Sequence, residues 1–339
     1  MSTVVTSVLW RKLLRAFPNS RALRNTYAFL SRAFDDEVRK IISGQLAFLD
    51  ERDRVARVSD LRRTVHRLEK ALSLRGGAPS VDDTLIDLSL DKLRLAMALT
   101  GHDDSSVRWA VRTLRQFFVD SEGRPEAAYH RFKELIREGS LQDSRDEALQ
   151  SEGEPRGHAA LEAYETLLEL AVNRHSVRCF QDRPVPRSLI DAAIDVARHA
   201  PSACNRQAFR YLILDDRRQV ERVLKIPGGA GEYAASVPVV LVVVGDYAAY
   251  QHDRDRHLIF IDSSLASMAL ILALETLGVA SCCVNFPALP DREEKMAGLL
   301  RLSPTDQVVM LIAAGYREAG SVSPSSAKKS LDELREFVT

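Results

Sequence analysis

Asn173-Arg-His-Ser-Val-Arg-Cys-Phe180 and Ala200-Pro-Ser-Ala-Cys-Asn-Arg-Gln207 are two polar segments that flank one short amphipathic segment, residues 186–199. Its apolar residues recur at helical spacing on one face: Leu189, Ile190, Ala193, Ile194 and Ala197. Pro186 suits the first turn of a helix, and Pro201 prevents the helix from continuing. We therefore expect one helix that holds two polar clusters at a fixed separation.

The two clusters carry different chemistry. Arg174 and Arg178, with the hydroxyl of Ser176, suit a phosphate or an anionic ring edge. Asn205 and Gln207 offer amides that donate and accept hydrogen bonds, as a ribityl chain or a pyrimidine ring requires. Two arginines in isolation are typical of a solvated helix end. Their combination with amides favours a ligand site that needs charge and hydrogen-bonding groups together over a solvated helix end.

Composition describes a folded globular chain. The 339 residues are 45% hydrophobic and 28% charged, a length that predicts about two domains. Lys+Arg and Asp+Glu both number 47, which gives no argument for nucleic acid or an anionic membrane. The apolar run 265–274 is followed by Glu275, so no membrane span is expected. Without a secretory leader or a CxxC motif, we expect a cytoplasmic protein with four reduced thiols: Cys179, Cys204, Cys282 and Cys283.

The first 150 residues lack strand-like alternation and show apolar residues at helical period. We expect helices over 61–74, 85–99, 107–118 and 127–136. Residues 141–157 are acidic, polar and rich in Ser, Glu and Gly, which is typical of a linker. The predicted organisation is a helical N-terminal domain over 1–140, a linker over 141–157 and a second domain over 158–339.

The second domain is predicted to contain both helices and strands. An amphipathic helix is expected over 159–172, and the predicted strands cover 211–214, 237–244, 279–286 and 308–314. Between the second and third strands we expect a helix with Asp262 as its N-cap and Gly278 as its C-terminal stop. This helix is apolar nearly all round, so it should be buried from two sides. Strands separated by helices indicate an α/β or α+β domain.

Several kinds of site are not supported. No GxGxxG follows a strand, Gly228-Gly-Ala-Gly231 lacks the GK[ST] of a P-loop, and no HExxH occurs. Residues 252–257 hold two histidines and two aspartates, including Asp255, in an order that suits a solvated loop at least as well as a metal. Cys204 has no base beside it in the sequence and resembles no catalytic nucleophile. No metal is expected.

Four motifs in order carry a resemblance. They are Arg174-His-Ser-Val-Arg-x-Phe180 with Val185-Pro, Ala200-Pro-Ser-Ala-x-Asn-x-Gln207, Leu274-Glu-Thr-Leu-Gly-Val-Ala-Ser-Cys282, and Ile312-Ala-Ala-Gly-Tyr316. Together they resemble the FMN-dependent nitroreductase family over about residues 165–335. The resemblance implies an α+β nitroreductase-like fold, with a central mixed sheet flanked by helices, and a homodimer with FMN at the interface. The all-α N-terminal domain is additional.

The resemblance also implies roles for individual residues. Arg174, with Ser176 nearby, would bind the FMN phosphate, and Arg178 would face the N1/O2 edge of the flavin. The family's basic phosphate ligand near the C-terminus would be Lys328 or Lys329. The implied cofactor-binding residues are Arg174, His175, Ser176, Arg178, Pro201, Ser202, Asn205, Gln207, Ser281, Cys282, Lys328 and Lys329.

The chain departs from the family pattern at two places. Gln207-Ala-Phe209 stands where Gln-Pro-Trp is usual, and no Pro-x-Glu-Gly loop follows Cys283. No catalytic side chain is expected, because the chemistry would be carried by FMN. The implied reaction moves hydride from NADH or NADPH through flavin N5 to a nitroaromatic, quinone or enone. The alternative is a flavin-binding module whose N-terminal helices dock a partner in a biosynthetic complex, such as one for polysaccharide.

Overall fold

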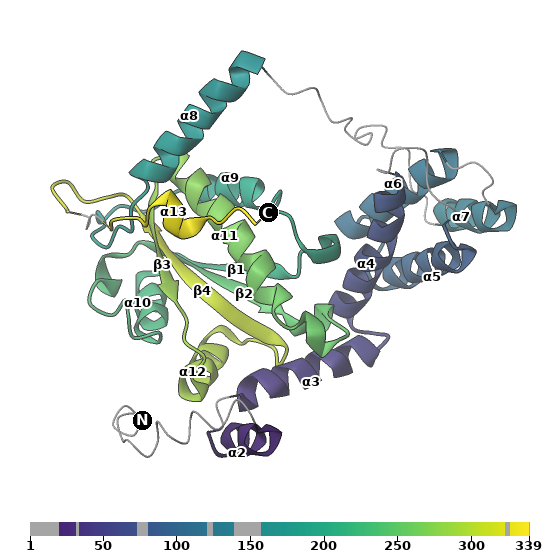
Figure 1. The fold of residues 1–339 in the computed structure, drawn as a ribbon, viewed down its shortest axis with the longest axis horizontal. Helices are drawn as coiled ribbons and strands as arrows, with labels where there is room; N and C mark the ends of the chain where they lie inside the picture. The colour runs from purple at the N-terminus through teal and green to yellow at the C-terminus, as the bar shows by residue number, and fades with distance from the viewer. Residues whose placement is uncertain are drawn as a thin grey trace.

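A computed structural model describes residues 20–31, 34–72, 81–120, 125–138, 157–322 and 326–338. It confirms the α+β class with an all-α N-terminal region (Figure 1). The predicted linker lies outside the described residues except for Gly157, where helix α8 begins. The division into domains at residues 140 and 158 stays a prediction.

The N-terminal region is helical wherever it is described, and the four helices expected there are confirmed. Their apolar stripes face one another, because each helix buries the face that its sequence period creates. α4 packs against α5 and α6, and α7 covers α5. The core between them contains Leu61, Leu68, Leu90, Leu114 and Phe118. The helices are α2 (Arg21–Ser31), α3 (Asp35–Leu49), α4 (Arg54–Leu72), α5 (Asp83–Thr100), α6 (Ser105–Asp120) and α7 (Glu126–Glu138).

The C-terminal region is built on a four-stranded sheet of order β1-β2-β4-β3. The four named strands all pair antiparallel, and an isolated bridge outside them, from Ser176 to Ser281, is parallel. β1 and β3 are the edge strands, and β2 and β4 lie between them. The strands are β1 (Phe209–Leu214), β2 (Val239–Asp246), β3 (Ala280–Asn285) and β4 (Asp306–Gly315).

Helices cover both faces of this sheet. Alternate residues of β2 point to opposite faces: Val240, Val242 and Val244 pack with α10 (Arg217–Lys225) and α12 (Pro290–Leu300). Leu241 and Val243 pack on the other face with α9 (Arg187–Ala197) and α11 (Leu258–Thr276). The remaining elements are α8 (Gly157–Asn173), α13 (Leu331–Leu334), and four 3₁₀ turns, η2 (Ala203–Asn205), η3 (Ala234–Ser236), η4 (Tyr247–Ala249) and η5 (Asp253–Asp255).

Helix α11 corrects the expectation about where it begins. It begins at Leu258, with His257 at the N-cap position, so the prediction that Asp262 caps it was wrong. Asp262 lies in the second turn, buried, where its carboxylate accepts a hydrogen bond from the Ala203 backbone instead. Within one chain the helix is buried from one side, and the expectation that a partner subunit covers its second side stays a prediction. Ile261, Leu265 and Met268 form a stripe that is about half exposed, at 51%, 45% and 45%.

By length and composition alone, the segment Asp253–Thr276, which includes α11, could cross a membrane. Half of its apolar window is buried inside the protein, where α11 packs on α9 and the sheet. A buried core helix of this composition is ordinary in an α+β domain.

The N-terminal helices dock directly on the C-terminal region. α3 and α4 contact η4, and α4 also contacts η2. The α3 backbone approaches η4 so closely that a Cβ at Gly44 would lie 2.5 Å from the Tyr247 carbonyl oxygen. Beside this contact, the buried Lys40 ammonium donates to Glu293 at 2.8 Å and to Gln307 at 3.0 Å. Close backbone packing and a buried, fully hydrogen-bonded charge fix α3 on the second region.

Candidate functional site

The first polar cluster lies along the edge strand β3. α8 ends at Asn173, and the chain then pairs with β3 through the bridge from Ser176 to Ser281. The Val177 backbone N–H donates to the Ser281 carbonyl at 3.1 Å. This pairing fixes the backbone on both sides of Arg174 and Arg178, because backbone groups on an edge strand readily accept another extended segment.

A pocket of about 200 Å³ opens beside this segment. None of its lining residues is acidic. Among the described residues, the guanidinium groups of Arg174 and Arg178 make neither a hydrogen bond nor an ion pair, and both side chains are at least partly exposed. Unpaired guanidinium groups beside a pocket without carboxylates suit an anionic ligand. The pocket is lined by Arg178, Pro227, Gly229, Tyr233, Cys282, Cys283, Val284, Asn285 and Pro287.

The pocket wall contains a phenol and two thiols. Burial raises the pKa of Tyr233, and the nearby Arg178 charge only partly opposes that effect, so the phenol is neutral at physiological pH. Its hydroxyl lies 3.7 Å from the Cys282 sulfur. Cys282 is buried, whereas Cys283 is exposed. Neighbouring residues on an edge strand point to opposite faces, which places one thiol inside and the other outside.

The second polar cluster, Ser202–Gln207, is a tight loop in front of β1. Cys204, Asn205 and Gln207 have φ values of 56°, 52° and 51°, which are uncommon for residues with a side chain. Within the loop, the Gln207 backbone N–H donates to Ser202 Oγ at 3.1 Å. The Gln207 side-chain amide donates to Asn205 Oδ1 at 2.6 Å. The two side-chain amides therefore hold each other in place.

Buried groups from other elements brace this loop. The Asp262 carboxylate accepts from the Ala203 N–H at 3.0 and 3.1 Å, and burial raises its pKa against the effect of that bond. Arg206 is buried, donates to Asp255 at 3.2 Å and lies 5.0 Å from the Tyr250 ring centroid. Asp255 thus belongs to an ion pair and not to a solvated loop.

One brace comes from the N-terminal region. The Arg62 side chain on α4 is buried, and its Nη1 donates to the Asn205 carbonyl oxygen at 3.1 Å. Sequence reasoning found neither Arg62 nor the Arg206–Asp255 pair. The only available signal was that Arg206 lies inside the polar segment; Arg62 is one of several arginines on a charged helix, and nothing local sets it apart.

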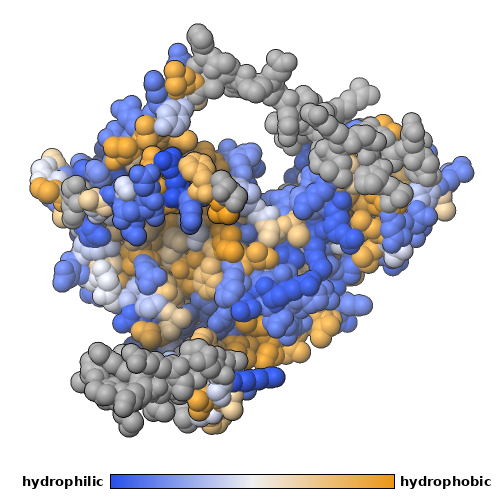
Figure 2. All heavy atoms as spheres, viewed as in Figure 1, coloured by the Kyte–Doolittle hydropathy of each residue, from blue (hydrophilic) through white to orange (hydrophobic). Residues whose placement is uncertain are grey.

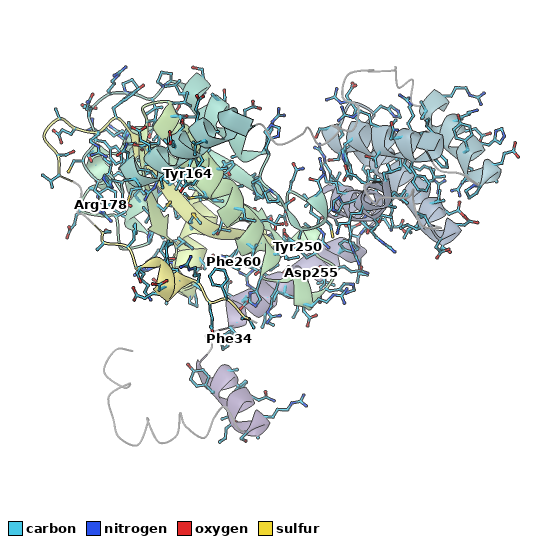
Figure 3. All side chains as sticks on the ribbon, turned by 45° about the horizontal axis from the view of Figure 1, so that its top comes forward. Phe34, Tyr164, Arg178, Tyr250, Asp255 and Phe260 are labelled. Atoms are coloured by element: carbon cyan, nitrogen blue, oxygen red, sulfur yellow. The ribbon has the colours of Figure 1, made fainter. Side chains whose placement is uncertain are left out.

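The two clusters lie at opposite edges of the sheet. The first cluster lies alongside the edge strand β3, and the second lies next to the start of the other edge strand, β1. Strands β4 and β2 separate them. Three strand spacings correspond to roughly 14 Å across a packed sheet. Figure 3 shows the same separation: Arg178 lies at one side of the C-terminal region, and Tyr250 and Asp255 at the other.

The remaining predicted cofactor residues are placed as follows. His175 and Pro201 are exposed beside the first and second clusters respectively, and Ser281 is buried in β3. Lys328 and Lys329 are exposed ahead of α13, and neither makes a hydrogen bond or ion pair within the described part of the chain. In those same residues, no three His, Cys, Asp or Glu side chains are grouped so as to hold a metal ion.

Part of the chain is similar to known proteins. Residues 171–316 match the model of the nitroreductase family. A Methanothermobacter thermautotrophicus protein named as an NADH dehydrogenase/NAD(P)H nitroreductase is 28% identical over 151 residues, which are 44% of this chain and 76% of that protein. Iodotyrosine deiodinase 1 of Rattus norvegicus is 22% identical over 195 residues, 49% of this chain and 67% of the relative.

Solved structures of similar chains include an NADH dehydrogenase/NAD(P)H nitroreductase of Parabacteroides distasonis, at 28% identity and a TM-score of 0.46. The alignment covers 51% of this chain and 99% of the Parabacteroides distasonis chain. The match to the family model spans both polar clusters and all four strands of the sheet. Residues 171–316 of this chain therefore form a domain of the nitroreductase family.

Proposed function

We propose that the protein is an FMN-dependent oxidoreductase that uses NADH or NADPH as reductant. The observation that carries the proposal concerns the guanidinium groups of Arg174 and Arg178. They lie beside an acid-free pocket on β3 and have no hydrogen-bond or ion-pair partner among the described residues. Membership of the nitroreductase family and relatives named as NAD(P)H nitroreductases support the same activity.

The donor set of the first cluster fits FMN. Arg174 and the Ser176 hydroxyl would hold the phosphate, since a guanidinium donates charge-assisted hydrogen bonds to phosphate oxygens. Arg178 would stabilise the edge of the ring that becomes negative on reduction, which favours the reduced state over the oxidised one. FMN, when bound, supplies the hydride-accepting centre. The residues of the chain bind, orient and shield it.

The second cluster completes the site only if another copy of the chain supplies it. Asn205 and Gln207 carry the amides that suit a flavin, yet they lie at the opposite edge of the sheet from Arg174. One cofactor cannot touch both clusters of one chain through the packed core. A homodimer in which the loop of one protomer meets β3 of its partner brings the two donor sets together.

The exposed apolar surface supports such a dimer. The α11 stripe of Ile261, Leu265 and Met268 continues into exposed apolar side chains of α8, which contacts α11. Figure 2 shows apolar atoms gathered over the middle of this face. An exposed patch of this extent is typical of a protein–protein interface. The α8 and C-terminal contributions are Leu161, Tyr164, Leu167, Leu168, Val172, Leu331, Leu334, Phe337 and Val338.

For the acceptor, we propose a small conjugated molecule such as a nitroaromatic, quinone or enone that stacks on the flavin. A cytoplasmic location remains our expectation. The alternative, a flavin-binding module that docks a partner through its N-terminal helices, is favoured by one observation. α3 exposes an apolar stripe of Phe34, Val38, Ile42 and Leu46 next to a groove shared with α2.

The visible spectrum of the purified protein, followed by anaerobic addition of NADH and NADPH, tests the proposal. We expect a flavin spectrum with about one FMN per chain, bleached by one or both nicotinamides and restored by a quinone. A flavin-loaded protein that neither nicotinamide reduces would favour the docking module. A protein that takes up no FMN would refute both.

A further inference from the structure

The loop Ser202–Gln207 holds a conformation that local sequence does not favour. Three of its residues, Cys204, Asn205 and Gln207, have positive φ, and none of them is glycine. Each such residue costs about 1 kcal/mol or more, and the conformation persists only when the surroundings impose it. Hydrogen bonds within the loop do not attach it to the rest of the protein. Contacts from other elements must therefore hold the loop in this conformation.

The N-terminal helical region supplies one of these braces through a single buried side chain. Arg62 on α4 is 8% exposed. Its Nε donates to Ser106 Oγ on α6 at 2.9 Å, and its Nη1 donates to the Asn205 carbonyl at 3.1 Å. The Trp109 ring lies 5.3 Å from the guanidinium carbon. Contacts with α6 therefore hold the same guanidinium that donates to the loop.

The partners of Arg62 are themselves fixed. Trp109 donates its indole N–H to Glu69 at 3.2 Å, and the other Glu69 oxygen lies 2.8 Å from His66 Nδ1. Asp104 accepts from the Ser106 backbone N–H at 2.8 Å. A hydrogen-bonded network on α4 and α6 therefore orients the guanidinium, and networks of this kind are more rigid than isolated pairs.

We propose that Arg62 is a positioning residue for the cofactor: it acts through the Asn205 carbonyl to hold the amides of Asn205 and Gln207 in their FMN-binding arrangement. The inference rests on the proposed function, since it concerns the loop that would contact FMN. It assigns the N-terminal helical region a part in the cofactor site, although that region lies outside the family match of residues 171–316.

The expected change in FMN affinity follows from the fraction of molecules whose loop is in the binding arrangement. If loss of Arg62 leaves the loop in its binding arrangement about a tenth of the time, the apparent FMN dissociation constant rises about tenfold. A hydrogen bond from a charged donor to a buried carbonyl is strong enough to produce a change of this size. Contacts of the first cluster with the phosphate should be unaffected.

The test compares Arg62→Ala with Arg63→Ala in the full-length chain. Arg63 is the next residue on α4 and also reaches the C-terminal region, where its Nη1 donates to Gln251 at 3.2 Å. It makes no hydrogen bond to the loop, so it controls for general docking of α4. Two measurements are made: the FMN dissociation constant by flavin fluorescence, and hydrogen exchange of the backbone amides of 202–207 in the flavin-free protein.

We expect Arg62→Ala to weaken FMN binding about tenfold and to speed exchange at residues 202–207, with Arg62→Lys recovering part of both effects. Arg63→Ala should change neither. If Arg62→Ala fails to fold, Ser106→Ala, which removes one anchor of the same guanidinium, should show the same pattern to a smaller degree. Equal FMN affinity and equal exchange in the two alanine variants would overturn the inference. Absence of FMN binding by the unmodified protein would instead overturn the proposed function, and the exchange measurement would still decide whether Arg62 holds the loop.

Discussion

The two polar clusters differ in how their shape is maintained. The segment with Arg174 and Arg178 is extended and is held by backbone pairing to β3, and its guanidinium groups have no partner in the described part of the chain. The loop with Asn205 and Gln207 has strained backbone angles, and its groups are tied to one another and to buried side chains. An extended segment is stabilised by the sheet alone, whereas a strained loop needs braces from several elements. The nitroreductase domain therefore builds the first cluster by itself and shares the second with the N-terminal helices.

The largest effect on FMN binding should come from splitting the proposed dimer, because this separates the first cluster of one chain from the second cluster of its partner. Met268→Asp places a charge in the exposed apolar stripe of α11. A charge left unpaired in a buried interface costs about 3–5 kcal/mol, so the dimer should weaken by about 100-fold or more. Light scattering at micromolar concentration should report a monomer, and FMN should be lost with the dimer. Leu88→Asp makes the matched change at an exposed position of α5 and should alter neither the dimer nor FMN binding. A monomer that retains FMN would contradict the shared site.

Removal of a phosphate contact should affect the first cluster alone. Arg174→Ala should weaken FMN binding by about 10- to 150-fold, because a charge-assisted hydrogen bond contributes about 1.5–3 kcal/mol. Titration of the flavin-free protein with FMN measures the change. Arg187→Ala removes an arginine from an exposed surface pair with Asp215 and serves as the control. Stoichiometric FMN in a folded Arg174→Ala protein would remove Arg174 from the phosphate site.

Forcing α3 away from η4 should disturb the second cluster and spare the first. A side chain at Gly44 meets the Tyr247 backbone at 2.5 Å, so Gly44→Val should lower the free energy of unfolding by about 1–3 kcal/mol. Denaturant unfolding gives that value, and hydrogen exchange should rise at 202–207 but not at 281–285. Gly298→Val, on α12 with nothing within 4 Å of its Cβ position, is the matched control. Equal changes in both segments would show that the two clusters are not supported separately.

The smallest effect should be electronic. Arg178→Ala should lower the flavin reduction potential, because the lost charge stabilises the reduced ring more than the oxidised one. A differential interaction of about 1.4 kcal/mol corresponds to about 30 mV for a two-electron couple. A redox titration against reference dyes measures it, and Arg178→Lys should recover part of the shift. Weaker binding at an unchanged potential would place Arg178 at the phosphate or in a structural role.

Local patterns in the sequence predicted most elements of the fold. Four helices of the N-terminal region follow from an apolar period of 3.6 residues, and the four strands of the sheet follow from short apolar runs, which depend only on neighbours along the chain. An error arose where a distant group changed the role of a residue. Asp262 has the side chain of an N-cap, but the Ala203 N–H, 59 residues away, takes its carboxylate.

The sequence by itself determined the family, the two polar clusters and the helix between them, because motif residues and helical spacing are local properties of the chain. Only the tertiary structure decided that the clusters lie at opposite edges of one sheet, since strand order is set by packing and not by position along the chain. It also decided that Arg62 reaches the Asn205 carbonyl across 143 residues of sequence. A buried hydrogen bond between regions so far apart has no local signature, because it forms only after both regions have folded and docked.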